Sequence, residues 1–367
     1  MIVKNIELKN FRNYRDFSSS FDGSLNVIIG DNAQGKTNLL EAIYYLVGAR
    51  SFRTRTDSDS IMFGEDYFEI SSDIFSEERC QKIKIICQKG KKKQVLINGV
   101  KARKYAELSG KVTAVLFSPD DLYIIKEGAA ARRRLMDDCI SQLRPKYLSS
   151  LIAFRRTLDQ KMKILKERDT IPSLLKTLED YDVLLAQHSA NLIYYRAHFA
   201  ESLSREAAKI HGDFSGGREK LEIKYKTVST IDDPKRKPSE LFELIMQHQI
   251  SHKAAELAAG TCLTGAHKDD LEIYINGKAA KSFASQGQTR TAALSIKLAE
   301  RQIHKNDSGE YPILLLDDVL SELDISRQNY IMGKITDGQV FITCCEEDKV
   351  ELLKNGKVLR IKEGSEI

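Results

Sequence analysis

Residues 30–37 have the residue types and spacing of a loop that binds the phosphates of a nucleotide. They fit G-x-x-x-x-G-K-[ST], in which glycines let the backbone approach the phosphates and successive N–H groups point at them. Lys36 is spaced to reach the β- and γ-phosphates, and the Thr37 hydroxyl to bind Mg²⁺. The sequence therefore predicts a nucleotide and Mg²⁺ as ligands of Gly30, Asp31, Asn32, Ala33, Gln34, Gly35, Lys36 and Thr37.

A second motif is a pair of acidic residues that follows an apolar run at residues 313–316. Four apolar residues that end in Asp317 and Asp318 predict a central parallel strand with carboxylates at its C-terminal edge, where open α/β sheets bind ligands. We expect Asp317 to hold Mg²⁺, directly or through water. Asp318 stands where hydrolysis needs a carboxylate that activates water, so Lys36 and Asp318 are the predicted catalytic residues.

Residues 285–288, called here the signature loop, precede a predicted helix and combine a serine with a glycine. Such a helix N-terminus forms a second cradle for an anion. One nucleotide does not need two cradles in one subunit, so we expect this one to contact the γ-phosphate of ATP held by a second copy of the chain. The sequence thus predicts ATP sandwiched in an ATP-dependent homodimer, with the second contact made by Ser285, Gln286, Gly287 and Gln288.

The elements that must position these residues follow from the hydrophobic pattern. Residues 25–29 read as a buried strand before the phosphate loop, and the apolar spacing after Thr37 predicts a helix that Gly48 caps. Strands are expected at 67–75, 82–87, 94–97, 112–117, 221–225, 271–275, 311–316 and 340–343. Helices are expected at 129–143, 146–168, 174–211, 240–259 and 289–304.

This alternation predicts an α/β head with a mainly helical second lobe that carries a short helical arm. The head is expected to comprise residues 1–125 and 300–367, and the second lobe residues 126–299 with the signature loop. A helix of about 30 residues spans about 45 Å, which sets the length of the arm.

Composition sets the broad class of protein. The chain has 367 residues, and no apolar run reaches the roughly 18 residues of a membrane helix, so a cytoplasmic protein is expected. A net charge of +5 permits a local basic patch for nucleic acid without demanding one. The six cysteines form no C-x-x-C pair, which favours reduced thiols over disulfides or a zinc site.

The order of a phosphate loop, an S-x-G-Q motif, an acidic strand end and an S-E-L-D loop at residues 321–324 resembles the ABC-type ATPase heads of the Rad50 and SMC proteins. Further details are similar to the RecF family. These are the segments at residues 8–14, 30–43, 118–122, 132–137, 265–271 and 285–290. Together these motifs run from residue 8 to residue 324, which is nearly the whole chain.

The resemblance implies a recombination mediator of bacterial DNA repair and replication. Members of the family bind ATP, dimerise on it and bind duplex DNA near junctions with single strands. They work with RecR and RecO to load RecA at single-strand gaps, and they feed the SOS response. It also implies a weak ABC-type ATPase that serves as a switch. The alternative is a structural DNA clamp of SMC type without a loading role, although the helical block is short for the arms of such a ring.

Several positions depart from the pattern of the ABC-type heads. These heads usually carry Glu where this chain has Asp318, whose reach is one methylene shorter, so we expect slow hydrolysis. No histidine follows the strand at 340–343, and no glutamine lies between Gln34 and Gln81 to serve as the usual Q-loop ligand. Arg12 either approaches the nucleotide phosphates, as in the Rad50-like heads, or is a surface arginine in a bend.

Three basic features leave alternatives open. Residues 90–93 form either a solvated hairpin turn or a contact with a DNA backbone. Residues 132–134, all arginine, are predicted on a helix and contact phosphates, acidic partners or only solvent. His267, next to Asp269 and Asp270, is either a catalytic or metal-binding residue or part of a structural loop, and we favour the loop because nothing else in the sequence completes a site.

Two other classes of protein are disfavoured. A nuclease that pairs such a head with a metal-dependent domain needs more than the about 40 residues that follow Asp324. A simple P-loop kinase has no use for the signature loop, and it stays monomeric with ATP.

Overall fold

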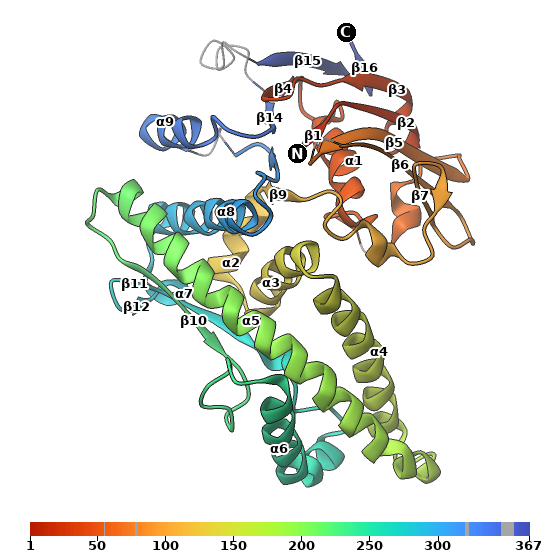
Figure 1. Ribbon diagram of the computed structural model, residues 1–367, viewed down its shortest axis with the longest axis vertical. Helices are drawn as coiled ribbons and strands as arrows, with labels where there is room; N and C mark the ends of the chain where they lie inside the picture. Colours follow the sequence, from red (N-terminus) through yellow and green to blue (C-terminus); the bar gives the residue numbers. More distant parts are fainter. Residues whose placement is uncertain (55, 78, 320–322, 346–355) are drawn as a thin grey trace. The chain divides into compact units, whose positions relative to one another are not determined.

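The computed structural model describes residues 1–54, 56–77, 79–319, 323–345 and 356–367 (Figure 1). The chain divides into two compact units. The first, here the head, comprises Met1–Asp121 and Lys297–Ile367, and the second, here the helical lobe, comprises Leu122–Ile296. The helix α8 (Gln286–Ser308) begins in the helical lobe and ends in the head.

The N-terminal part of the head forms a mainly antiparallel sheet in the order β3-β2-β5-β6-β7-β8, with β1 paired to β5. Along β2, Ile6 and Leu8 are buried and alternate with exposed polar residues, as expected of a strand with one face on a core. The strands of this sheet are β1 (Ile2–Val3), β2 (Asn5–Phe11), β3 (Tyr14–Ser20), β5 (Tyr67–Ser76), β6 (Arg79–Gln88), β7 (Gln94–Ile97) and β8 (Val100–Lys101).

A second sheet in the head has the order β16-β15-β4-β14-β13-β9. Its strands run parallel except β16, which pairs antiparallel with β15. The interior strands are short and almost wholly buried, which is why they read as continuous apolar runs in the sequence. The strands are β4 (Leu25–Ile29), β9 (Ala114–Phe117), β13 (Ile313–Leu316), β14 (Val340–Cys344), β15 (Lys357–Lys362) and β16 (Ser365–Glu366).

The helix α1 (Lys36–Gly48) is buried on nearly all sides, and one hydrophobic core combines its apolar residues with those of both sheets. The predicted cap at Gly48 is wrong. The helix ends at Gly48, as predicted, but the capping residue is Ala49, which takes the left-handed conformation (φ 51°) and whose N–H donates to the Tyr45 carbonyl at 2.8 Å. The head also contains α9 (Ile325–Lys334) and the short 3₁₀ helices η1 (Asp57–Ser60), η2 (Tyr105–Leu108) and most of η3 (Pro119–Leu122).

The helical lobe is built around two long helices that pack side by side, α4 (Pro145–Glu167) and α5 (Leu178–Ser215) (Figure 1). The 38 residues of α5 give it a length of about 57 Å; the predicted helix at 174–211 has the same number of residues but begins and ends four residues earlier. The Lys161 ammonium lies 2.7 Å from Asp182 and 2.6 Å from Glu256, which joins α4, α5 and α6 in one buried ion cluster. The other helices are α2 (Tyr123–Lys126), α3 (Ala129–Leu143), η4 (Pro172–Thr177), α6 (Pro238–Ala259), η5 (Ala266–Lys268) and α7 (Ala280–Phe283).

A small antiparallel sheet, in the order β10-β11-β12, packs on α5. Its strands are β10 (Leu221–Lys226), β11 (Asp270–Ile275) and β12 (Lys278–Ala279). The turn between β11 and β12 has positive φ at both Asn276 and Gly277, the backbone that this residue pair favours in hairpins. None of the helices that the structure describes is long and apolar enough to cross a membrane.

Candidate nucleotide site

The phosphate loop connects β4 to α1, as predicted. Gly35 has φ 120°, a conformation that glycine adopts readily and L-residues rarely do. A Cβ on Gly30 would lie 2.3 Å from the Ile361 carbonyl oxygen, so only glycine fits beside β15. Among the residues that the structure describes, no side chain caps the N-terminus of α1, and its first N–H groups therefore stay available to an anion in the loop.

Residues distant in sequence hold the loop in this shape. The Asn13 side-chain amide donates to the Gln34 carbonyl at 2.9 Å, and the Tyr14 hydroxyl donates to the Gly35 carbonyl at 3.1 Å. From the C-terminal hairpin, the Gly364 N–H donates to the Gln34 carbonyl at 3.1 Å. The Glu363 N–H donates to the Gln34 side chain at 2.7 Å. The loop is thus clamped from both ends of the chain.

Lys36 and Thr37 lie at the start of α1, and Asp317 lies just past the end of β13. The Lys36 ammonium donates to the Gly30 and Asp31 carbonyls at 2.5 and 2.9 Å and to the Cys345 sulfur at 3.2 Å. The Thr37 hydroxyl donates to Asp317 Oδ1 at 2.9 Å. A hydroxyl and a carboxylate at this distance form an all-oxygen donor set, which fits the hard cation Mg²⁺.

Thr343, at the end of the adjacent strand β14, connects both acidic residues. Its hydroxyl donates to Asp317 Oδ1 at 3.0 Å and accepts from the Asp318 N–H at 2.8 Å. Asp317 is buried, and burial raises the pKa of its carboxyl while the two hydroxyl contacts act in the opposite direction. Asp318 is exposed and has φ 54°, a left-handed conformation that is uncommon outside glycine and typical of functional sites.

Arg12 is fixed by an ion pair. It lies in a bend with φ 54°, and its guanidinium donates to both carboxylate oxygens of Glu41 at 2.9 and 2.6 Å. Glu41 is fully buried on α1 and also accepts from the Ser51 hydroxyl at 2.5 Å. These contacts hold Arg12 against the helix that follows the phosphate loop, and its approach to phosphates stays a prediction.

The signature loop lies in the helical lobe, at the start of α8. Ser285 and Gln286 are exposed, and Ser285 and Gln288 bond each other reciprocally across the first turn of the helix. In the loop at residues 321–324, Ser321 and Glu322 lie outside the described residues, whereas Asp324 caps α9 by accepting from the Arg327 N–H at 2.9 Å.

The arginines at residues 132–134 are not one solvated face. Arg132 is buried and donates to both carboxylate oxygens of Asp270 at 2.6 and 2.9 Å. Arg133 donates to the Asp269 carbonyl at 2.8 Å, while the Arg134 side chain is largely exposed. Only Arg134 therefore remains as a surface group of this run.

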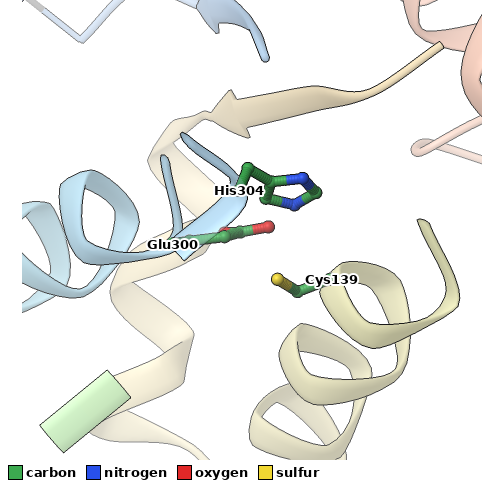
Figure 2. Close-up of side chains that lie close together, drawn as sticks. All are labelled: Cys139, Glu300 and His304. Atoms are coloured by element: carbon green, nitrogen blue, oxygen red, sulfur yellow. The ribbon is translucent and has the colours of Figure 1, made fainter. Parts of the chain in front are cut away.

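Two histidine features belong to the interior rather than to the nucleotide site. The His267 ring donates from Nε2 to the Cys262 carbonyl at 3.2 Å, and burial lowers its pKa to about 4, so it is neutral at physiological pH. Figure 2 shows Glu300 and His304 one turn apart on α8, with Cys139 drawn from α3 of the helical lobe. Glu300 lies 2.5 Å from the Lys297 ammonium, and burial lowers the pKa of His304 to about 3.

In the lysine-rich turn at residues 90–93, Lys93 is largely buried and its ammonium lies 2.6 Å from Asp57, while Lys91 and Lys92 are exposed. A contact of this turn with DNA thus rests on Lys91 and Lys92 alone.

Sequence reasoning missed Thr343 and Glu41. In the sequence, Thr343 only marks the end of a strand that no histidine follows. Glu41 has one signal in the sequence, because a carboxylate inside an otherwise apolar helix needs a buried cationic partner.

The model for the "RecF/RecN/SMC N terminal domain" matches residues 2–365. The chain is 40% identical to "DNA replication and repair protein RecF" of Acetivibrio thermocellus over 362 residues, covering 99% of this chain and 98% of that one. It is 39% identical to the protein of the same name in Clostridium perfringens strain SM101, covering 99% of each.

Among solved structures, "Structure of the recombination mediator protein RecF-ATPrS in RecFOR pathway" matches with a TM-score of 0.93 at 34% identity, covering 99% of this chain and 97% of that one. A second, "Structure of the recombination mediator protein RecF-ATP in RecFOR pathway", matches at 0.88 with 35% identity, covering 100% and 98%. An Smc head bound to a domain of ScpA matches in fold alone, at 0.57 and 16% identity, covering 100% and 96%. The predicted fold class, an ABC-type α/β head with a helical second lobe, is confirmed.

Proposed function

The chain belongs to the RecF family, and we propose that it is an ATP-dependent DNA-binding protein of recombinational repair and replication. The observation that carries this proposal is the contact between Thr37 on the phosphate loop and Asp317 on the neighbouring strand, with Asp318 beside it. The names of its relatives, which include "DNA replication and repair protein", and the ATP-bound solved structures support it.

In this proposal the N–H groups of the phosphate loop bind the ATP phosphates, and Lys36 turns from the loop carbonyls toward the β- and γ-phosphates. Thr37 and Asp317 would hold Mg²⁺, which when bound neutralises charge on the phosphate oxygens. Asp318 orients and deprotonates the attacking water. Because Asp318 has a short side chain on a left-handed backbone, we expect a turnover below the roughly 10 s⁻¹ that is the enzyme median.

The signature loop supports the second part of the proposal, which is dimerisation across ATP. Ser285 and Gln286 are exposed at a helix N-terminus, which suits an anion presented by another molecule. We expect a second copy of the chain to bind across ATP in this way, so that two copies enclose two nucleotides. Duplex DNA is then held by the ATP-bound dimer near single-strand gaps. RecR and RecO are the expected partners in loading RecA, with a role in the SOS response and a cytoplasmic location.

The test is sedimentation of the wild type, Lys36→Met and Ser285→Arg, each with and without ATP and duplex DNA. The wild type is expected to dimerise with ATP and to retain DNA only as a dimer. Lys36→Met loses the phosphate contact, and Ser285→Arg places a bulky cation in the second cradle, so both are expected to stay monomeric. Lys235→Met removes an exposed lysine of the helical lobe and serves as the control.

Nucleotide binding separates the two variants. Ser285→Arg is expected to bind a fluorescent ATP analogue as the wild type does, whereas Lys36→Met is expected to lose binding. A wild type that stays monomeric with both ATP and DNA present would overturn the composite site.

A further inference from the structure

The two ends of the signature loop form a reciprocal capping box. The Gln288 N–H donates to the Ser285 hydroxyl oxygen at 3.2 Å, and the Ser285 N–H donates to the Gln288 side-chain oxygen at 2.9 Å. Two of the N–H groups at the start of α8 are thereby satisfied within the loop. The box also fixes the rotamer of Ser285, the residue expected to meet the γ-phosphate.

The box leaves the Ser285 hydroxyl able to donate. Its oxygen accepts from the Gln288 N–H, and no acceptor for its hydrogen occurs among the described residues. Since Ser285 is exposed, this hydrogen is available to a phosphate oxygen. The orientation of that donor depends on the Gln288 side chain staying in the box.

Glu219 determines which way the Gln288 amide points. The Gln288 Nε2 donates to Glu219 Oε1 at 2.8 Å, across 69 residues of sequence. A carboxylate only accepts hydrogen bonds, so it takes the NH₂ group and leaves the amide oxygen for the Ser285 N–H. If the amide turned over, its NH₂ group would face the Ser285 N–H and the box would break.

Glu219 is itself held in place by His211. The ring Nε2 lies 3.0 Å from Glu219 Oε2, and Nδ1 lies 3.3 Å from the Ser295 hydroxyl on α8. His211 is fully buried on α5, and burial lowers its pKa. Because a carboxylate only accepts hydrogen bonds, the contact with Glu219 places a ring proton on Nε2. A rigid residue of the long helix thus anchors the carboxylate that orients the signature loop.

We propose that Glu219 is a positioning residue for the signature loop: it fixes the Gln288 amide, and so aims the Ser285 hydroxyl at the γ-phosphate of ATP bound by a second copy of the chain. The proposal rests on the proposed function. Glu219 does not touch the nucleotide and acts only through Gln288.

The experiment measures the dissociation constant of the ATP-dependent dimer by sedimentation, for Glu219→Ala, Gln288→Glu and the double variant Glu219→Gln with Gln288→Glu. Glu219→Ala removes the acceptor. Gln288→Glu keeps the capping oxygen but sets two carboxylates against each other. Each is expected to weaken the dimer at least about tenfold, the effect of one hydrogen bond to a charged group.

The double variant exchanges the roles of the two side chains, because the amide introduced at position 219 would donate to the carboxylate introduced at position 288. It is expected to return the dissociation constant to within about threefold of the wild type. Glu201→Ala, which removes an exposed carboxylate of α5, is the matched control. Binding of a fluorescent ATP analogue to monomeric protein is expected to be unchanged in every variant, since the phosphate loop is intact.

Two outcomes overturn the inference alone while ATP still dimerises the wild type. In one, Glu219→Ala and Gln288→Glu dimerise as the wild type does. In the other, Gln288→Glu is weak and the double variant is equally weak, so the contact is not the cause. A wild type that does not dimerise when ATP is added overturns the proposed function and this inference together. If Glu219→Ala fails to fold, the dissociation constants of Gln288→Glu and of the double variant still test the inference.

Discussion

Thr343 is a single residue on which two carboxylates depend. Its hydroxyl donates to Asp317 and accepts from the Asp318 N–H, so it helps to set the position of the predicted metal ligand and of the predicted catalytic carboxylate. Because it is almost fully buried, water cannot replace either contact.

Thr343→Val keeps the shape of the side chain and removes both hydrogen bonds. We expect single-turnover ATP hydrolysis to fall at least tenfold, since the Asp318 N–H loses its hydrogen-bond partner, at a cost of about 1–3 kcal/mol, and the Asp318 backbone is no longer held in place. ATP affinity should stay within about threefold, but with a higher Mg²⁺ requirement. Thr343→Ser should restore hydrolysis, and Thr230→Val is the control at an exposed site. Equal hydrolysis in Thr343→Val and the wild type would contradict this role.

Among single residues, the sequence predicted those that belong to a motif with fixed spacing. Lys36 and Thr37 follow from the loop pattern, and Asp317 follows from an apolar run that ends in acids. Thr343 and Glu219 were not predictable, because each acts through a contact that only the folded chain creates: Thr343 pairs across a parallel sheet, and Glu219 contacts Gln288 69 residues away.

Among the elements, β15 lies directly against the phosphate loop. Gly30→Ala would place a methyl group 2.3 Å from the Ile361 carbonyl on this strand, a contact with backbone that a rotamer change cannot relieve. We expect a loss of about 3 kcal/mol in the free energy of unfolding, typical of overpacking, together with weaker ATP binding.

Urea denaturation and binding of a fluorescent ATP analogue measure both effects of Gly30→Ala. Gly212→Ala on α5, where a Cβ meets nothing within 4 Å, should be neutral or stabilising. A Gly30→Ala protein as stable as the wild type would show that β15 yields at this point.

The helices and strands differ in how far their own residues, rather than contacts with distant residues, predict them. The helices α3, α4 and α6 begin and end within about two residues of their predicted bounds, because apolar periodicity and a proline or glycine mark them. The strands β15 and β16 were not predicted, since half of the residues of β15 are charged, which hides the apolar pattern, and β15 is stabilised by pairing with β4.

For the whole molecule, buried neutral histidines predict acid sensitivity. Burial lowers the pKa of His267 from 6.5 to about 4, so the unfolded chain binds the extra proton between these values. Stability is therefore fully present above pH 6.5 and is lost as the pH falls toward 4. From pH 7.5 to pH 5, His267 alone should remove about 2 kcal/mol, at 1.36 kcal/mol for each pH unit below 6.5.

Urea denaturation at pH 7.5 and pH 5 of the wild type and His267→Gln tests this. The variant should lose about 2 kcal/mol less than the wild type between the two pH values, whatever its stability at pH 7.5. His198→Gln replaces a histidine on α5 and is the control. An equal loss in His267→Gln and the wild type would mean that His267 does not stay neutral.

The family and the fold class of the whole molecule were predictable because several motifs occur in one order along nearly the whole chain. The contact between an ATP-bound second copy and the signature loop was inferred only because one nucleotide does not need two anion cradles in one subunit. This contact stays a proposal.

The position of β4 has a consequence for synthesis on the ribosome. This strand carries the phosphate loop, yet its two neighbours in the sheet, β14 and β15, begin only at residues 340 and 357. At about 5–20 residues per second, roughly 15 to 60 s pass between translation of residue 29 and of residue 340. The helical lobe has been made in the meantime. Until then the phosphate loop lacks the strands that pair with β4. The head therefore completes its folding only when the last strands leave the ribosome.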